Sequence, residues 1–283
     1  MKVAILFALA AVASMFLATS AAASDGKARE IRVERIIQAP VARVWEAWTT
    51  PEGFQAVLDR PLSVELRPGG PYEVFFAPEA PEGQRGSELC KVLSFLPERM
   101  LSFSWNAPPK FPELRAKGPT TFVVVELRPL GPDMTKVTLT HLGWPSAPTE
   151  LAEQWDGAFE YFTAAWPRVL DAFQSKLAPE GASAIDPKQG WTYLIRIARG
   201  VSPDQLTPEE IARCQEHAGY IAALTKQGVI QFAGPCTDFI GPGIVIFRAK
   251  DEAAARAIME NDPAVKAGVF TAELHPIRFS FTN

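Results

Sequence analysis

The side chains that most often perform chemistry are few in this chain of 283 residues. Its histidines and cysteines, three of each, are His141, His217, His275, Cys90, Cys214 and Cys236. No zinc-ligand spacing, glycine-rich nucleotide motif, H-E-x-x-H motif or G-x-S-x-G motif occurs. The histidines fall in different predicted elements. We therefore expect no cofactor, and no metal site built from one chain.

His217 lies in a segment with helical periodicity that follows Thr207. The apolar and small residues predicted to form the buried stripe of this helix are Ile211, Cys214, Ala218, Ile221 and Thr225. At the angular step of an α-helix, His217 lies roughly 60° from the centre of that stripe. A border position gives an imidazole both a buried partner and access to solvent, as general acid–base work requires.

Asp262 supports two compatible interpretations. It ends a predicted helix that begins at Asp251, and the helix dipole disfavours a carboxylate there by about 0.3–1 kcal/mol. A nearby imidazolium would offset that cost. Asp262-Pro263 is also a natural N-cap followed by proline at the first position of a new turn. The sequence alone does not show that His217 and Asp262 touch.

His141 is the second histidine with a candidate role. It shares parity with Val137 and Leu139 on a strand predicted over 135–142, so it projects from the apolar face. Aromatic residues that could line a pocket with it are Phe103, Trp105, Trp155 and Phe159. Apolar walls with one polar group are typical of small-molecule sites. The alternative is a plain core, in which His141 bonds a neighbouring carbonyl.

The first half of the chain reads as strands closed by one long helix. Apolar alternation from Arg29 to Gln38 predicts a strand, and Pro40 then opens a helix. Further predicted strands, separated by short turns, cover 62–66, 72–77, 87–95, 100–106, 121–128 and 135–142. Such short connections favour an antiparallel meander. An amphipathic helix over 149–177 must cover this sheet, and Pro167 predicts a kink within it.

Two motifs in this half resemble a known superfamily. They run from Gln38 to Pro51 (QAPVARVWEAWTTP) and from Thr140 to Trp144 (THLGW). Together with the aromatic closing helix, they make residues 29–177 similar to the START-like or SRPBCC superfamily, in particular its branch related to co-chaperone ATPase activators. The resemblance implies a helix-grip fold, with a cavity between sheet and helix that often holds an apolar ligand. Functions vary widely on this fold.

A Pro-, Gly- and Ala-rich segment over 178–190 has no periodicity and marks a domain boundary. Beyond it, strands are predicted over 192–198, 229–233, 243–248 and 272–281. One helix opens with the capping box at Thr207 and another begins at Asp251. The order βαββαβ is the ferredoxin-like pattern. The predicted class is therefore α+β, with a helix-grip domain followed by a ferredoxin-like domain at 191–283.

The second half resembles the YciI-like family of dimeric α+β barrels. The residues that carry the resemblance are Cys214–Tyr220 (CQEHAGY), Gly228, Gly234-Pro235 and Asp262–Val269 (DPAVKAGV). The resemblance implies dimerisation through back-to-back sheets and a small cleft that contains His217 and Asp262 as catalytic residues. In this hypothesis Asp262 orients one imidazole nitrogen while the other exchanges a proton with a small substrate.

Composition and the N-terminal residues set the wider limits. The chain is 47% hydrophobic, 21% charged and carries a net charge of −4, without a basic stripe, so we expect no nucleic-acid partner.

Residues 1–23, with Lys2, an apolar stretch and Ala21–Ala23, predict a cleaved signal peptide. The alternative is an uncleaved anchor. Cleavage would give an exported protein, periplasmic or secreted, without stable membrane insertion.

An exported chain meets conditions that permit disulfides. A Cys214–Cys236 bridge and three buried thiols remain alternatives, and the second is favoured.

Three functions follow from the whole sequence. The leading one is binding of a hydrophobic small molecule in the first domain, with a homodimer formed through the second. The others are an enzyme acting by proton transfer at His217 and Asp262, and a protein-interaction module.

Overall fold

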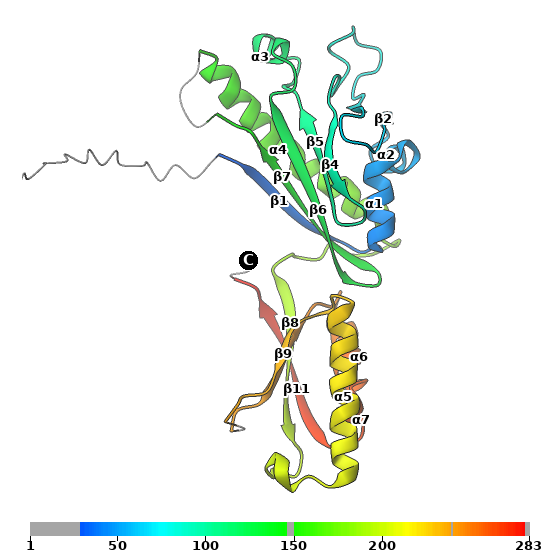
Figure 1. Ribbon diagram of the computed structural model, residues 1–283, viewed down its shortest axis with the longest axis vertical. Helices are drawn as coiled ribbons and strands as arrows, with labels where there is room; N and C mark the ends of the chain where they lie inside the picture. The colour runs from blue at the N-terminus through cyan, green and yellow to red at the C-terminus, as the bar shows by residue number, and fades with distance from the viewer. Residues whose placement is uncertain (1–28, 146–149, 239, 281–283) are drawn as a thin grey trace, which may run out of the picture.

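The computed structural model describes residues 29–145, 150–238 and 240–280. The expected leader, residues 1–23, lies outside the described residues. The described residues form two large antiparallel sheets, one in each domain, and helices pack against each (Figure 1). A third sheet has only two short strands. The predicted α+β class, a helix-grip domain followed by a ferredoxin-like domain, is confirmed. Within the described ranges, no helix is long and apolar enough to span a bilayer.

The element bounds are as follows. The first domain contains β1 (Ile31–Ile37), α1 (Val41–Thr49), α2 (Pro51–Leu58), β2 (Leu62–Val64), β3 (Tyr72–Val74), β4 (Val92–Leu96), β5 (Met100–Trp105), α3 (Pro112–Ala116), β6 (Thr121–Gly131), β7 (Met134–Leu142) and α4 (Ala152–Leu177). The second contains β8 (Gln189–Ile197), a 3-10 turn (Pro203–Gln205), α5 (Pro208–Lys226), β9 (Ile230–Gly234), β10 (Gly243–Phe247), α6 (Glu252–Glu260), α7 (Pro263–Lys266) and β11 (Phe270–Arg278).

The five-stranded sheet of the first domain has the order β1-β7-β6-β5-β4, so the predicted meander holds from β4 to β7. The first strand joins the far edge, where Ile31 lies opposite His141. The short strands β2 and β3 pair separately. The strand predicted over 87–95 is shorter and begins at Val92. A positive φ of 66° at Leu89 interrupts the extended backbone there.

The long helix α4 buries one stripe against the sheet. Its buried residues are Ala158, Phe162, Trp166, Leu170 and Phe173. Phe173 stacks on Trp48 of α1 with ring centroids 4.2 Å apart, which ties the two helices together. The helix runs without a break through Pro167. Stripe and sheet together form a continuous apolar core.

The second domain has the sheet order β11-β8-β10-β9, with α5, α6 and α7 packed on one face. Tyr193 and Phe247, both fully buried, lie at the centre of its core. The predicted α5 stripe was partly wrong, because Ala218 and Thr225 are exposed and Ile211 is 43% exposed. The inward face instead carries larger side chains, His217 among them. Small residues such as alanine and threonine fit either face and define a stripe poorly.

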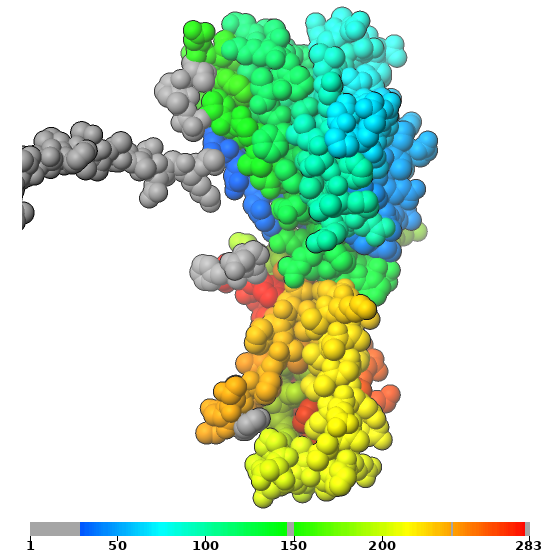
Figure 2. Space-filling view, viewed as in Figure 1, coloured from blue at the N-terminus to red at the C-terminus, as the bar shows by residue number. Residues whose placement is uncertain are grey.

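The two domains meet at the tip of the β6–β7 hairpin (Figure 1). Arg128 of this hairpin donates to Gln231 of β9 at 3.0 Å. Gly228, just after α5, lies so close that an added Cβ would stand 2.2 Å from the Pro129 carbonyl oxygen. The connecting residues also pack on the first domain, since Ile185 bridges to Ile36. Figure 2 shows that the molecule narrows where the domains meet.

Candidate functional site

His217 and Asp262 lie in direct contact in the second domain. His217 Nδ1 stands 2.6 Å from Asp262 Oδ2, and the Tyr193 hydroxyl donates to the same oxygen at 2.9 Å. The other carboxylate oxygen accepts the Ala264 amide at 3.1 Å. Asp262 therefore caps α7 and binds the histidine at once. The helix predicted to end at Asp262 ends earlier, at Glu260.

Three elements bring these side chains together. The capping box of Thr207 and Glu210 fixes the start of α5, which carries His217. The turn from α6 to α7 places Asp262 under that helix. Strand alternation puts Tyr193 on the helix-covered face of β8 with Trp191 and Ile195. This alternation is visible in the sequence and could have indicated Tyr193.

The carboxylate of Asp262 is fully buried but remains ionised. Burial alone would raise its pKa, yet the hydrogen bonds from His217, Tyr193 and the Ala264 amide hold the pKa below its usual value. The Tyr193 hydroxyl stays protonated, because burial and the adjacent carboxylate raise its pKa. Asp262 is thus an acceptor that two side-chain donors satisfy.

These contacts fix the imidazole of His217 in one orientation. Nδ1–H donates to Asp262, so in the neutral ring Nε2 carries the free lone pair. No described residue hydrogen-bonds Nε2, and the side chain is 17% exposed. Phe270 packs edge-on against the ring at a centroid distance of 5.3 Å. The arrangement suits a base that takes a proton from a molecule beside it.

A cavity of about 470 Å³ adjoins this pair. Cys214, one turn before His217, and Phe270, which touches the imidazole, both line it. Its other walls are largely apolar, and Cys236 also lines it. His217 stands beside the cavity rather than in its wall. All three cysteines are free thiols, with Cys90 buried and the other two half-buried.

In the first domain, His141 is wholly buried and both its ring nitrogens are engaged. Trp166 Nε1 donates to Nδ1 at 2.9 Å, and Nε2 lies 2.8 Å from the Thr121 hydroxyl. Because Nδ1 accepts, Nε2 carries the proton. Burial lowers the pKa of His141 to about 3. In this arrangement neither ring nitrogen is available to a ligand.

The aromatic residues predicted to line a pocket are spread over different surroundings. Phe103 is buried and stacks on Tyr72 at 4.1 Å. Trp155 and Phe159 are half-buried and pack around Trp144. Trp105 lines a cavity of about 160 Å³ with Tyr161 and Phe162 of α4. The structure therefore does not gather Phe103, Trp105, His141, Trp155 and Phe159 around one cavity among those it describes.

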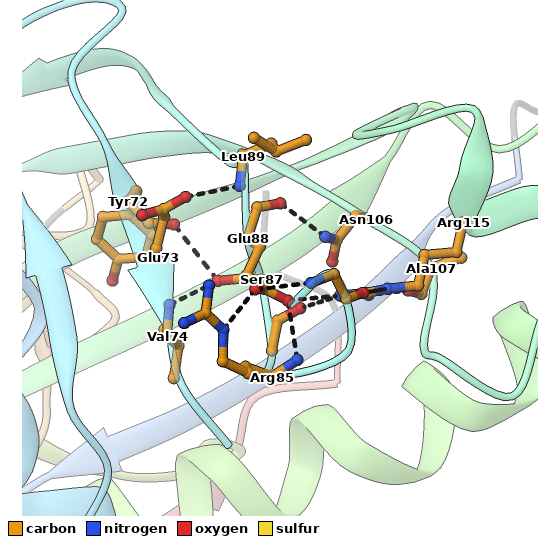
Figure 3. Close-up of polar contacts among 12 residues, drawn as sticks. Tyr72, Glu73, Val74, Arg85, Ser87, Glu88, Leu89, Asn106, Ala107 and Arg115 are labelled. Atoms are coloured by element: carbon orange, nitrogen blue, oxygen red, sulfur yellow. Dashed lines mark hydrogen bonds and ion pairs between the residues drawn. The ribbon is translucent and has the colours of Figure 1, made fainter. Parts of the chain in front are cut away.

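Arg85 and Arg115 line the Trp105 cavity. Both bind Glu88 in an ion-pair network that sequence reasoning missed (Figure 3). Glu88 accepts from Arg85 Nε at 2.7 Å and from the Arg85 and Gly83 amides. Arg115 reaches Glu88 at 3.4 Å and donates to the carbonyls of Gly86 and Ala107. These contacts clamp the β3–β4 loop to the segment after β5. Arg115 and Glu88 are 27 residues apart in sequence, so no local pattern predicted their contact.

Comparisons with known proteins agree with the resemblances predicted for both halves of the chain. Residues 38–178 match the family model described as Activator of Hsp90 ATPase homolog 1-like protein, and residues 195–276 match the YCII-related domain. Each domain is thus similar to one of these two families. The predicted START-like and YciI-like resemblances are thereby confirmed. A search of curated proteins finds no match.

Several solved structures are similar to the chain at low sequence identity. A protein from Mesorhizobium loti is 20% identical over 53% of this chain and 96% of its own, with a TM-score of 0.38. The Aha1 dimer from Colwellia psychrerythraea is 16% identical over 54% and 98%, with a TM-score of 0.35. CalU16 from Micromonospora echinospora is 22% identical over 70% and 88%, with a TM-score of 0.36.

Proposed function

We propose that the protein binds a small, largely apolar molecule in the second domain and exchanges a proton with it at His217 Nε2. The contact of 2.6 Å between His217 Nδ1 and Asp262 Oδ2, beside an apolar cavity, carries this proposal. An oriented imidazole with one free nitrogen is the usual form of a general base. Of the three functions considered, the enzyme therefore has the strongest geometric support.

The first test uses 5-nitrobenzisoxazole, a ring that opens when a base removes one carbon-bound proton. We expect the wild-type protein to accelerate ring opening, followed by absorbance, and His217→Ala to lose this acceleration. Asp262→Asn should lower it, since asparagine keeps the α7 cap but does not accept the Nδ1 proton as a carboxylate does. A loss of tenfold or more is expected, because base catalysis typically contributes 10²–10⁴-fold.

The matched control is His275→Ala. This histidine is 51% exposed on β11 and lies outside the cavity. It should leave the rate unchanged. Equal loss in both alanine variants, or full activity of a folded His217→Ala protein, contradicts the proposal.

A second candidate function is ligand binding by the first domain. Its support is the cavity lined by Trp105, Tyr161 and Phe162, since aromatic walls are typical of apolar ligand sites. Native mass spectrometry of the protein purified from the exporting cell would detect a retained ligand. The same spectrum would show whether residues 1–23 have been removed, which tests the proposed export.

We also propose a homodimer formed through the second domain. The helix-free face of its sheet carries Phe232, 57% exposed, opposite Ile246 on the neighbouring strand, and Ile244 opposite Leu194. An apolar stripe of this kind marks an interaction surface. The YCII-related match is compatible with homodimerisation.

Phe232→Glu should convert the dimer to a monomer, because a carboxylate cannot be buried without a partner. Size-exclusion chromatography with light scattering measures the change. Leu96→Glu serves as the control, since Leu96 is 51% exposed but lies on the first domain. A dimer that survives Phe232→Glu, or that is lost with Leu96→Glu, excludes this face.

A further inference from the structure

A cleft of about 650 Å³ lies between the two domains. Leu130 and Met134 of the first domain and Val229 and Ile258 of the second contribute to its walls. The volume falls in the range of sites for drug-sized ligands. Neither the His217 pair nor the Trp105 cavity lies in it, so it is a separate site.

One wall carries Arg248, which is only 6% exposed. Its Nη1 donates to the carbonyls of Pro187 and Gln189 at 2.8 and 2.9 Å, and its guanidinium lies over the Phe279 ring at 4.3 Å. These contacts hold the side chain in place. They occupy only one of its nitrogens.

The opposite edge of the guanidinium has no hydrogen-bond partner among the described residues. Nε is buried without a hydrogen-bond partner, and no described residue accepts from Nη2. This Nε–Nη2 edge is the fork that binds a carboxylate or phosphate through two parallel hydrogen bonds. Arg199 uses the same edge on Glu210 in this protein.

No described carboxylate forms an ion pair with Arg248. The acids that act on it electrostatically are Glu34 and Asp186, and both are engaged elsewhere. Glu34 pairs with Arg32 and Lys136, and Asp186 pairs with Arg278. A buried cation without a counterion is costly, so the site favours an anion.

The mouth of the cleft is also positively charged. Arg43 and Lys250 line it, are exposed, and have no ion-pair partner among the described residues. Asp133 is the one acidic residue of the described lining. Three cations against one carboxylate attract anions to a cleft with apolar walls.

We propose that this cleft binds an amphipathic anion, with its carboxylate or phosphate head on the free edge of Arg248 and its apolar part between the domains. Such a ligand contacts both domains and therefore fixes their relative orientation. The site is independent of the proton-transfer function proposed above.

The test is calorimetric titration of the full chain with decanoate. Three comparison probes are used. Decyl phosphate changes the anionic head group, decanol removes the charge, and acetate removes the apolar tail. We expect decanoate or decyl phosphate to bind at least about tenfold more tightly than decanol or acetate, because both parts of the site contribute. Sedimentation with phosphatidylglycerol vesicles separates a free amphiphile from a bilayer headgroup.

Variants locate the binding. Arg248→Gln should weaken decanoate binding about tenfold or more. Ala254→Phe, which fills the cleft from α6 without touching Arg248's carbonyl contacts, should abolish it. Lys250→Gln should weaken it a few-fold, most at low salt. Lys266→Gln on α7, exposed and away from the cleft, is the matched control.

The proposal is overturned if decanol binds as tightly as decanoate, or if Ala254→Phe retains wild-type affinity. It is also overturned if Lys266→Gln weakens binding as much as Lys250→Gln. Binding to vesicles without any binding of decanoate or decyl phosphate would equally exclude a free ligand in the cleft.

Discussion

Two histidines of this chain have opposite surroundings and therefore opposite chemistry. His141 has both nitrogens engaged inside an aromatic core, with Trp144 and Phe162 rings 4.6 and 4.9 Å from its own. His217 has one nitrogen engaged by a buried carboxylate, and no described residue hydrogen-bonds the other. Burial with complete hydrogen bonding makes the first a structural residue. Incomplete hydrogen bonding beside a cavity makes the second a candidate catalytic residue.

Replacing His141 tests this structural role. His141→Phe leaves the buried Trp166 Nε1–H without an acceptor, so we expect the free energy of unfolding at pH 7 to fall by about 1–3 kcal/mol. Urea denaturation measures it. The loss should shrink at pH 5. Burial lowers the pKa of folded His141 to about 3 while the unfolded residue titrates near 6.5, so below pH 6.5 only the unfolded state gains this proton.

The wild-type contribution of His141 therefore declines as the pH falls from about 6.5 towards 3, by roughly 1.4 kcal/mol per pH unit. The phenylalanine variant lacks this decline. Parallel stability curves for the two proteins between pH 7 and pH 5 would show that His141 is not held neutral.

At the scale of elements, the sequence predicts well where helices begin and predicts poorly which face of a helix is buried. Thr207 and Asp262 cap α5 and α7 as predicted. The face of α5 was misassigned, because small residues gave a weak periodicity. In helix α4, strong aromatic packing maintains the helix although it contains a residue that disfavours helix. Pro167 lies within α4 and cannot donate a backbone hydrogen bond.

Pro167→Ala should therefore stabilise the first domain. The substitution restores one helical hydrogen bond and removes the ring clash, for an expected gain of about 1–3 kcal/mol in thermal or urea unfolding. Pro208→Ala is the comparison, since a proline at the first position of α5 costs nothing there and its removal should bring no gain. Equal effects of the two substitutions would mean that α4 has adapted fully to its proline.

At the scale of the whole molecule, the joint between the domains depends on one glycine. Gly228 has a φ of +79°, and the Pro129 carbonyl stands where its side chain would be. Both features require glycine. The β6–β7 hairpin can dock on the second domain only because that position has no Cβ. The cleft between the domains, and the site proposed in it, depend on this docking.

Gly228→Ala should therefore separate the domains without unfolding either. We expect a larger radius of gyration in small-angle scattering and faster proteolysis within residues 178–188. Gly268→Ala is the matched control, because Gly268 has a φ of +71° but no atom within 4 Å of an added Cβ. It carries the same backbone strain without the clash. If both variants behave alike, the hairpin contact does not hold the domains together.

The sequence by itself determined the α+β class, the resemblance to two families and most element positions, because alternation, helical stripes, caps and short motifs are local properties of the chain. It placed His141 on the apolar face and singled out His217 and Asp262. Only the tertiary structure decided which nitrogens remain free, that Tyr193 completes the Asp262 site, that Glu88 meets Arg115, and that Arg248 lines a cleft unpaired. Those outcomes depend on contacts between residues distant in the chain, and local patterns carry no record of the space and partners that folding leaves to each side chain.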